Sequence, residues 1–205
     1  MIILPSLYFG SIEYWAAMIQ GGDDVVVDVG ENYVKRSERN RTEIMTSGGV
    51  MQLSVQLAHA NRPRQPMRAM RIDYSKRWPH QHLIAIESAY RSSPYYLYYG
   101  DAVRALYAKE WSRLVDLNMA TLEAVAKMLK ITMPRISQEY VVAGAEDVDL
   151  RKKKVGPTLC VEPYIQVFDD RMDFVGGLSI LDLIMCEGPE AKEYLQRVDL
   201  SSLGL

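Results

Sequence analysis

The chain has 205 residues, enough for one well-packed domain and too few for two full domains. Its 48% hydrophobic and 24% charged residues exclude a disordered, collagen-like or coiled-coil protein. The formal net charge of −2 conceals a basic middle, because residues 35–113 carry 14 basic and 6 acidic side chains while residues 1–34 and 114–205 each sum to −5. The neutral total argues against a nucleic-acid binder, whereas the basic middle predicts an anion-binding face.

Cysteine usage and hydropathy predict a cytoplasmic protein. Cys160 and Cys186 are 26 positions apart and form no CxxC pair, so neither a disulfide framework nor a thiolate zinc site is expected. The first basic residue is Lys35, which leaves no charged n-region of a secretory signal. No apolar run approaches the roughly 18–20 residues that cross a bilayer. We therefore expect no membrane insertion, no bound metal and no cofactor.

The first thirty residues predict a βαβ unit. Residues 1–4 form a short apolar run that Pro5 ends. Ser11 then precedes apolar residues at the i, i+3, i+4, i+7 spacing of an amphipathic helix, which ends at Gly21-Gly22. The β-branched run of residues 25–29 is typical of a buried strand. Such a unit favours a sheet with parallel character.

A hairpin and a helical region are predicted next. Ser47-Gly48-Gly49 separates residues 42–46 from residues 50–57, and glycine supplies the positive φ that a tight turn needs. Residues 70–74 alternate as a further short strand. A helical insertion is expected over about residues 79–131, starting with Pro79 in a first helical turn.

Within this insertion, Asp101 and Asp116 are expected to cap two more helices.

The last quarter is expected to return to strands at residues 136–142 and 159–168. Between them, Arg151 to Lys154 suggests a solvated loop. Ser179 and Asp182 have the spacing of a helix capping box.

These elements together predict a single α/β domain over residues 1–200. Its mixed central sheet is opened by the βαβ unit, and a frayed tail occupies residues 201–205.

No common catalytic motif is present. A P-loop, a dinucleotide GxGxxG, a GxSxG nucleophile elbow and a zincin HExxH are all missing from the sequence. His80 and His82 are two positions apart, which on a helix directs them away from each other. What remains is three clusters of polar and aromatic side chains.

The first cluster is the most basic stretch of the middle segment. It holds Tyr33, Lys35, Arg36, Arg39, Asn40 and Arg41. Guanidinium groups match phosphate or carboxylate oxygens with two parallel N–H donors, and asparagine adds neutral recognition. The alternative is a solvated sheet edge that resists aggregation.

The second cluster holds Trp78, His82 and Tyr90, followed by four tyrosines within residues 95–99. His82 is a candidate general base, since an imidazole titrates near neutral pH. The tyrosines offer flat rings for stacking on a base or sugar. Alternatively, His82 is a hydrogen-bonded structural residue, and the tyrosines lie at a solvated edge of the core.

The third cluster combines Tyr164 and Gln166 with Ser179 and Asp182. Strand alternation puts Tyr164, Gln166 and Phe168 on one face, where glutamine is an unusual core residue. Ser179 and Asp182 fit a helix cap better than a catalytic pair.

In this order, the clusters resemble the WbqC-like protein family of bacteria. The matching stretches span nearly the whole chain: Pro5 with Tyr8-Phe9-Gly10 and Tyr14, Glu31-Asn32-Tyr33-Val34-Lys35, Arg39-Asn40-Arg41, Leu53-Ser54-Val55, Trp78 with Gln81-His82, Ser88-Ala89-Tyr90, Ser93-Pro94-Tyr95, Asp116-Leu117-Asn118, Tyr164 to Phe168, Leu178 to Leu183 and Glu187-Gly188-Pro189. The chain departs from the family pattern at Gln56, where proline is usual, and at Met185-Cys186, where Phe-Asn is usual.

The resemblance implies a cytoplasmic transferase of surface-polysaccharide (O-antigen) biosynthesis, which attaches an aminoacyl or acyl group to a nucleotide-linked amino sugar. On that interpretation the basic cluster binds the diphosphate and His82 deprotonates the attacking amine. The implied substrate-binding residues are Tyr8, Tyr33, Lys35, Arg39, Asn40, Arg41, Trp78, Tyr90, Tyr164 and Gln166. Two alternatives stay open: a nucleotidylyltransferase- or ligase-like enzyme, which the opening βαβ unit favours, and a non-catalytic binding or assembly protein.

Overall fold

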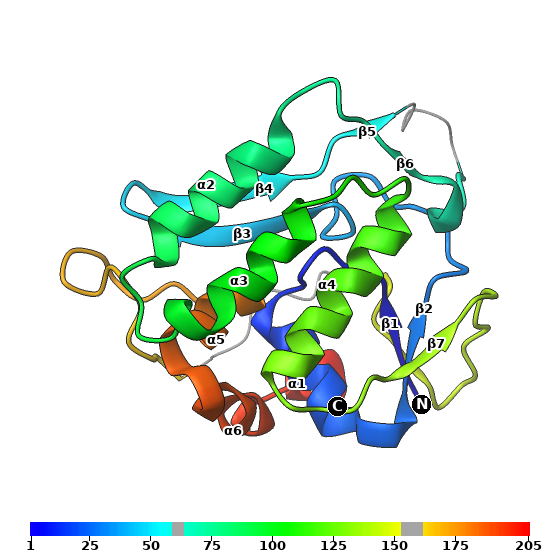
Figure 1. Cartoon of the computed structure of the whole chain (residues 1–205). Coiled ribbons are helices and arrows are strands. Elements are labelled where there is room, and N and C mark those ends of the chain that lie inside the picture. The colour runs from blue at the N-terminus through cyan, green and yellow to red at the C-terminus, as the bar shows by residue number, and fades with distance from the viewer. Residues whose placement is uncertain (59–63, 153–161) are drawn as a thin grey trace.

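A four-stranded parallel sheet organises the molecule (Figure 1). The computed structural model describes residues 1–58, 64–152 and 162–205. The strand order is β7-β2-β1-β8, with β1 (Ile2–Pro5) next to β2 (Val25–Asp28) and β8 (Val148–Asp149). The outer strand, β7 (Arg135–Ser137), pairs with β2.

The path of the chain creates a topological switch point. From β1 it steps to β2 and β7 on one side, and it then returns to β8 on the other side of β1. The order of the strands therefore reverses between β1 and β8. In open parallel sheets, a crevice at the carboxyl ends of such a strand pair is where ligands bind.

The predicted βαβ unit is confirmed. Helix α1 (Ile12–Gly21) joins β1 to β2, and these two strands pair in parallel from Ile2 opposite Val25. Ser11 is the N-cap of α1, and its hydroxyl accepts a hydrogen bond from the backbone N–H of Tyr14 at 3.4 Å. After a short 3₁₀ helix, η1 (Gly22–Asp24), the β-branched strand β2 is fully buried.

Two antiparallel pairs lie outside the parallel sheet. The predicted hairpin is formed by β3 (Arg41–Thr46) and β4 (Gly49–Ser54). The second pair is β5 (Leu57–Ala58) with β6 (Arg71–Ile72), preceded by the 3₁₀ helix η2 (Met67–Ala69). The α/β class is thus confirmed. The central sheet is parallel, and the antiparallel ladders lie in these two separate pairs, with isolated antiparallel bridges such as Ser11 with Ser179 besides.

Three helices follow: α2 (Trp78–Tyr90), α3 (Tyr96–Tyr107) and α4 (Leu114–Met128). Helix α2 packs on the β3-β4 hairpin, and α3 lies between α2 and α4 (Figure 1).

The two predicted aspartate caps of this region are wrong. Asp101 lies inside α3 and Asp116 in the first turn of α4, where its charge still complements the helix dipole.

Helices α5 (Ile180–Glu187) and α6 (Ala191–Arg197) follow, joined by the 3₁₀ helix η3 (Gly188–Glu190). Ser179 is the N-cap of α5, as predicted, and accepts a hydrogen bond from the backbone of Leu181 at 3.3 Å. Among the described helices, none is long and apolar enough to span a membrane.

The strands expected late in the chain are short or missing in the described residues. The segment predicted at 136–142 is reduced to β7, and residues 162–168 form no strand. The tail that we expected to be frayed forms the 3₁₀ helix η4 (Ser201–Leu203). Leu203 is buried there against the core, which gives this end of the chain an apolar anchor.

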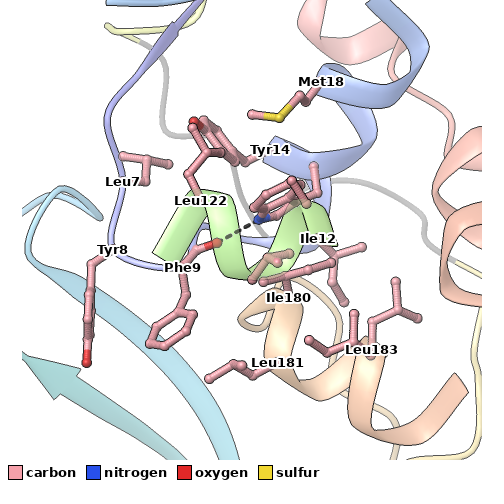
Figure 2. Close-up of a cluster of buried hydrophobic side chains, with 14 of the residues drawn as sticks. Leu7, Tyr8, Phe9, Ile12, Tyr14, Met18, Leu122, Ile180, Leu181 and Leu183 are labelled. Carbon is pink, nitrogen blue, oxygen red and sulfur yellow. Dashed lines mark hydrogen bonds between the residues drawn. The ribbon is translucent and has the colours of Figure 1, made fainter. Parts of the chain in front are cut away.

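The loop between β1 and α1 is fixed from inside the core (Figure 2). Phe9 has a left-handed backbone, with φ of 62°, and its carbonyl accepts a hydrogen bond from the Trp15 indole at 2.6 Å. The Tyr14 hydroxyl donates to the carbonyl of Pro5 at 3.0 Å. In Figure 2 the rings of Tyr8 and Phe9 point away from Tyr14. The end of β1 is therefore a rigid support for what is built on it.

The backbone packs closely around Gly30, near the carboxyl end of β2. A Cβ on Gly30 would lie 2.3 Å from the backbone of Glu139 and Tyr140. Gly30→Ala should therefore lower the free energy of unfolding by about 2 kcal/mol or more, because backbone atoms cannot yield as a side chain can. Gly48→Ala is the matched control, since its Cβ would meet nothing nearer than 3.9 Å. Urea titration of the three proteins measures the effect, and equal midpoints for both variants would contradict it.

Candidate functional site

A pocket of about 340 Å³ opens at the carboxyl ends of β1 and β8, at the switch point of the sheet. We call it the basic pocket. Its walls come from the β1–α1 loop, the segment leading into β3, the residues after β8 and the residues before α5. They are Pro5, Leu7, Ser11, Val34, Lys35, Arg36, Ser37, Glu38, Arg39, Arg41, Thr42, Glu43, Gln52, Arg151, Lys152, Gly177 and Ser179.

The walls carry an excess of positive charge, with six basic and two acidic side chains. Two of the cations, Arg39 and Arg151, are held in salt bridges. For the other four (Lys35, Arg36, Arg41 and Lys152) no salt bridge joins them to any residue of the described ranges. The Arg41 Nε atom is also buried without a hydrogen-bond partner there. The pocket therefore suits a ligand with more than one negative charge.

Arg39 is a buried structural cation. Its Nε donates to Oε1 of Glu31 at 2.8 Å, and its Nη2 donates to Oε2 of Glu31 and to the carbonyl of Arg151 at 3.1 Å. Burial raises the pKa of Glu31, and the hydrogen bonds from Arg39 oppose that rise. Of the predicted phosphate-binding cations, Lys35 and Arg41 are thus the unpaired ones, while Arg39 shapes the wall.

Arg151 is the residue that sequence reasoning missed. Its guanidinium donates through Nε and Nη2 to the two oxygens of Asp149, at 2.8 and 2.7 Å, and through Nη1 to Asp28. Only 6% of Arg151 is exposed, so the expectation of a solvated loop is wrong at this residue. Lys153 and Lys154 lie outside the described residues. The sequence signal for a buried Arg151 is Asp28 at the end of an apolar strand, because a buried carboxylate needs a cationic partner.

Two helices begin at the basic pocket. Ser11 and Ser179, the N-caps of α1 and α5, both line it. Hydrogen bonds from the Ile12 N–H to the Leu178 carbonyl and from the Ile180 N–H to the Gly10 carbonyl, both 3.0 Å long, join the two helix starts. Helix N-termini carry partial positive charge, so both helix starts add to the field of the cations.

Asn40 and Tyr33 support the pocket from behind. The Asn40 amide donates to the carbonyl of Val55 at 2.9 Å and accepts from the Tyr33 hydroxyl at 2.9 Å. Neither residue lines the pocket. Asn118 of α4 donates to the carbonyls of Ser6, at 3.1 Å, and Arg39, at 2.8 Å. These amides join the β1–α1 loop, the Arg39 segment and β4 into one support.

Asp182 forms hydrogen bonds with three of the predicted site residues. Its carboxylate accepts hydrogen bonds from the hydroxyls of Tyr90, at 2.9 Å, and Tyr164, at 2.6 Å, and from the amide of Gln166, at 2.8 Å. Asp182 is fully buried, and burial raises its pKa against the effect of these donors. The three residues are thus neighbours, as strand alternation suggested for two of them, but outside the basic pocket.

Cys186, one turn further along α5, is a buried thiol. Burial and the nearby charge of Asp182 raise its pKa, which leaves the thiol protonated and a poor nucleophile.

His82 lies in an aromatic cluster outside the basic pocket. The Tyr8 hydroxyl is 3.1 Å from its Nδ1, and the Trp78 ring meets it edge to face with centroids 5.0 Å apart. The Trp78 indole donates to the carbonyl of Asp73 at 2.9 Å. Burial lowers the pKa of His82 to about 4, although a hydrogen bond to the backbone of Ser54 opposes this shift. The imidazole is therefore neutral at pH 7, and its role as general base stays a prediction.

The lowered pKa of His82 gives a pH dependence of stability. In the unfolded chain its pKa is near 6.5 and in the folded chain about 4, so the stability present above pH 6.5 is lost as the pH falls toward 4. Between pH 7 and pH 5 this group should lower the free energy of unfolding by about 2 kcal/mol. Urea titrations at both pH values should show a smaller pH difference for His82→Gln than for the wild type. The exposed His80 provides the control His80→Gln, which should behave as the wild type; an unchanged pH difference in His82→Gln would refute the prediction.

Comparisons with known proteins identify relatives of this chain. A relative from Mycobacterium tuberculosis (strain ATCC 25618 / H37Rv), the uncharacterized protein Rv1507c, is 25% identical over 205 residues, covering 85% of this chain and 88% of the relative. No solved structure matches the chain significantly. The model of the WbqC-like protein family matches residues 6–167, a range that contains most of the basic pocket. The chain belongs to the WbqC-like protein family.

Proposed function

We propose that the protein is a cytoplasmic transferase that acts on a nucleotide-linked amino sugar and holds the diphosphate of that substrate in the basic pocket. The observation that carries the proposal is the position of four unpaired cations at the switch point of a parallel sheet, within the described part of the chain. A diphosphate has the charge to engage several of them at once. The proposed reaction, transfer of an aminoacyl or acyl group to the sugar amine in surface-polysaccharide synthesis, rests on the resemblance set out in the sequence analysis.

The pocket offers the electrostatic part of such chemistry. Acyl transfer develops negative charge on the carbonyl oxygen, and preorganised donors stabilise it. Arg41 lines the pocket with an Nε that is unpaired among the described residues, and the N-cap residues Ser11 and Ser179 bring the partial positive charge of two helix starts to the wall. Lys35 and Arg36 belong to the same short segment as Arg41. We assign Lys35, Arg36 and Arg41 to the phosphates.

The two alternatives differ in what they release or bind. A nucleotidylyltransferase- or ligase-like enzyme would use the same pocket for a nucleoside triphosphate and would release pyrophosphate. A non-catalytic binding protein would bind an acidic partner surface and would respond to neither ligand. A concave pocket at which two helix N-termini converge favours a small ligand over a flat partner surface.

Arg41→Ala should weaken binding of UDP- or dTDP-linked amino sugars about tenfold, because one hydrogen-bonded ion pair is lost. Titration calorimetry measures the dissociation constant, and a thermal-shift assay at saturating ligand should show a clear rise in Tm for the wild type. Arg68→Ala is the matched control, since Arg68 is exposed in the same basic third of the sequence but lies outside the pocket.

The results separate the three candidate functions. Binding of no nucleotide sugar by the wild type would reject the proposal. An equal loss of nucleotide-sugar affinity in Arg41→Ala and Arg68→Ala would reject the basic pocket as the binding site. Release of pyrophosphate from a nucleoside triphosphate would favour the nucleotidylyltransferase-like alternative.

A further inference from the structure

The basic pocket also has an acidic wall, which the proposed phosphate contacts do not use. The two acidic residues that line the pocket are Glu38 and Glu43. Glu38 is half-buried, and its Oε2 atom is shielded from solvent. Glu43 is exposed on β3, and no salt bridge joins it to a residue of the described ranges. Glu43 is therefore the carboxylate that a ligand in the pocket can reach.

The register of the β3-β4 hairpin places Glu43 on the same face as Arg41. Side chains two residues apart in a strand share a face, and so do the side chains of residues directly opposite each other in an antiparallel pair. Glu43 is two residues after Arg41, and it lies opposite Gln52. Arg41, Glu43 and Gln52 all line the basic pocket. The hairpin therefore contributes a cation and a carboxylate to the same wall.

Glu43 is held at this wall by hydrogen bonds to its backbone and to its side chain. Its carbonyl accepts a hydrogen bond from the backbone N–H of Ser179, the N-cap of α5, at 2.7 Å. Its Oε1 atom accepts a hydrogen bond from Nε2 of Gln52 at 3.4 Å. Because Ser179 and Gln52 line the pocket as well, both contacts keep Glu43 at the pocket wall.

A carboxylate at this position discriminates among anionic ligands. Two residues of an extended strand are separated by about 7 Å between their Cα atoms, and no salt bridge joins the side chains of Arg41 and Glu43. A ligand that carries only phosphates is repelled by Glu43. A ligand that also carries an amino group several ångströms from its phosphates gains a charge-assisted hydrogen bond to the carboxylate.

We propose that Glu43, supported by Gln52, binds the amino group of the substrate and so selects amino sugars over sugars with a hydroxyl group at that carbon. The inference rests on the proposed function, because it takes the phosphates to lie on Lys35, Arg36 and Arg41. Glu43 is thus a specificity-determining residue of the basic pocket, and the cations hold the part that all nucleotide sugars share.

Two matched pairs of ligands test this assignment: UDP-glucosamine with UDP-glucose, and dTDP-4-amino-4,6-dideoxyglucose with dTDP-6-deoxyglucose. The members of a pair differ only in an amino or a hydroxyl group, at carbon 2 in the first pair and at carbon 4 in the second. In titration calorimetry at pH 7, the wild type should bind the amino sugar of at least one pair about tenfold more tightly than its hydroxyl partner.

Glu43→Gln should abolish this preference, because the amide lacks the charge that attracts an ammonium group. It should also bind the hydroxyl sugar about threefold more tightly than the wild type, since the repulsion between Glu43 and the phosphates is removed. Glutamine keeps the shape of glutamate at an exposed position, so the variant should fold. Glu193→Gln is the matched control, because Glu193 is exposed and lies outside the pocket, and it should bind every ligand as the wild type does.

The outcomes separate this assignment from the proposed function. Arg41→Ala should weaken binding of both members of a pair and retain the preference for the amino sugar. Equal binding of the two members of each pair by the wild type, or an unchanged preference in Glu43→Gln, would overturn the role of Glu43 and leave the phosphate site in place. Failure of the wild type to bind any nucleotide sugar would overturn both proposals.

Discussion

The rest of the structure depends on buried ion pairs at the carboxyl ends of the parallel strands. These ion pairs form two groups. Arg151 bridges Asp28, at the end of β2, to Asp149, at the end of β8, and Arg39 pairs with Glu31 while bonding the carbonyl of Arg151. Charges removed from water are costly unless they are paired, and loss of one partner of a buried pair costs about 3–5 kcal/mol. The pairs therefore fix the relative positions of segments that are far apart in the sequence.

The same arrangement explains how the basic pocket keeps unpaired cations. Arg39 and Arg151 compensate the buried carboxylates, which leaves Lys35, Arg36 and Arg41 without salt bridges in the described part of the chain. Positive charge held without a partner beside two helix N-termini attracts an anion. Cations that form salt bridges and cations that form none with the described residues thus line the same pocket.

Several residues that carry the family resemblance turn out to be internal supports. Asn118 fixes the carbonyls of Ser6 and Arg39, and Asp182 fixes Tyr90 and Tyr164. Buried polar groups that are hydrogen-bonded in this way favour one arrangement of the chain. The motifs of the family are therefore informative about the shape of the pocket as well as about its chemistry.

The sequence by itself determined the local features. Periodicity, glycine placement and charge act over a few residues and can be read from the sequence. They predict the β1–α1–β2 unit, the hairpin around Ser47, the N-caps Ser11 and Ser179, and the basic stretch that includes Lys35 and Arg41. Only the tertiary structure decided which cations are free. Whether Arg39 and Arg151 meet a ligand or a carboxylate depends on Glu31, Asp28 and Asp149, and the pairing of Arg151 with Asp28 spans 123 positions of the chain. Long-range pairing of buried charge has no local signature, because its energy arises only when folding removes both groups from water.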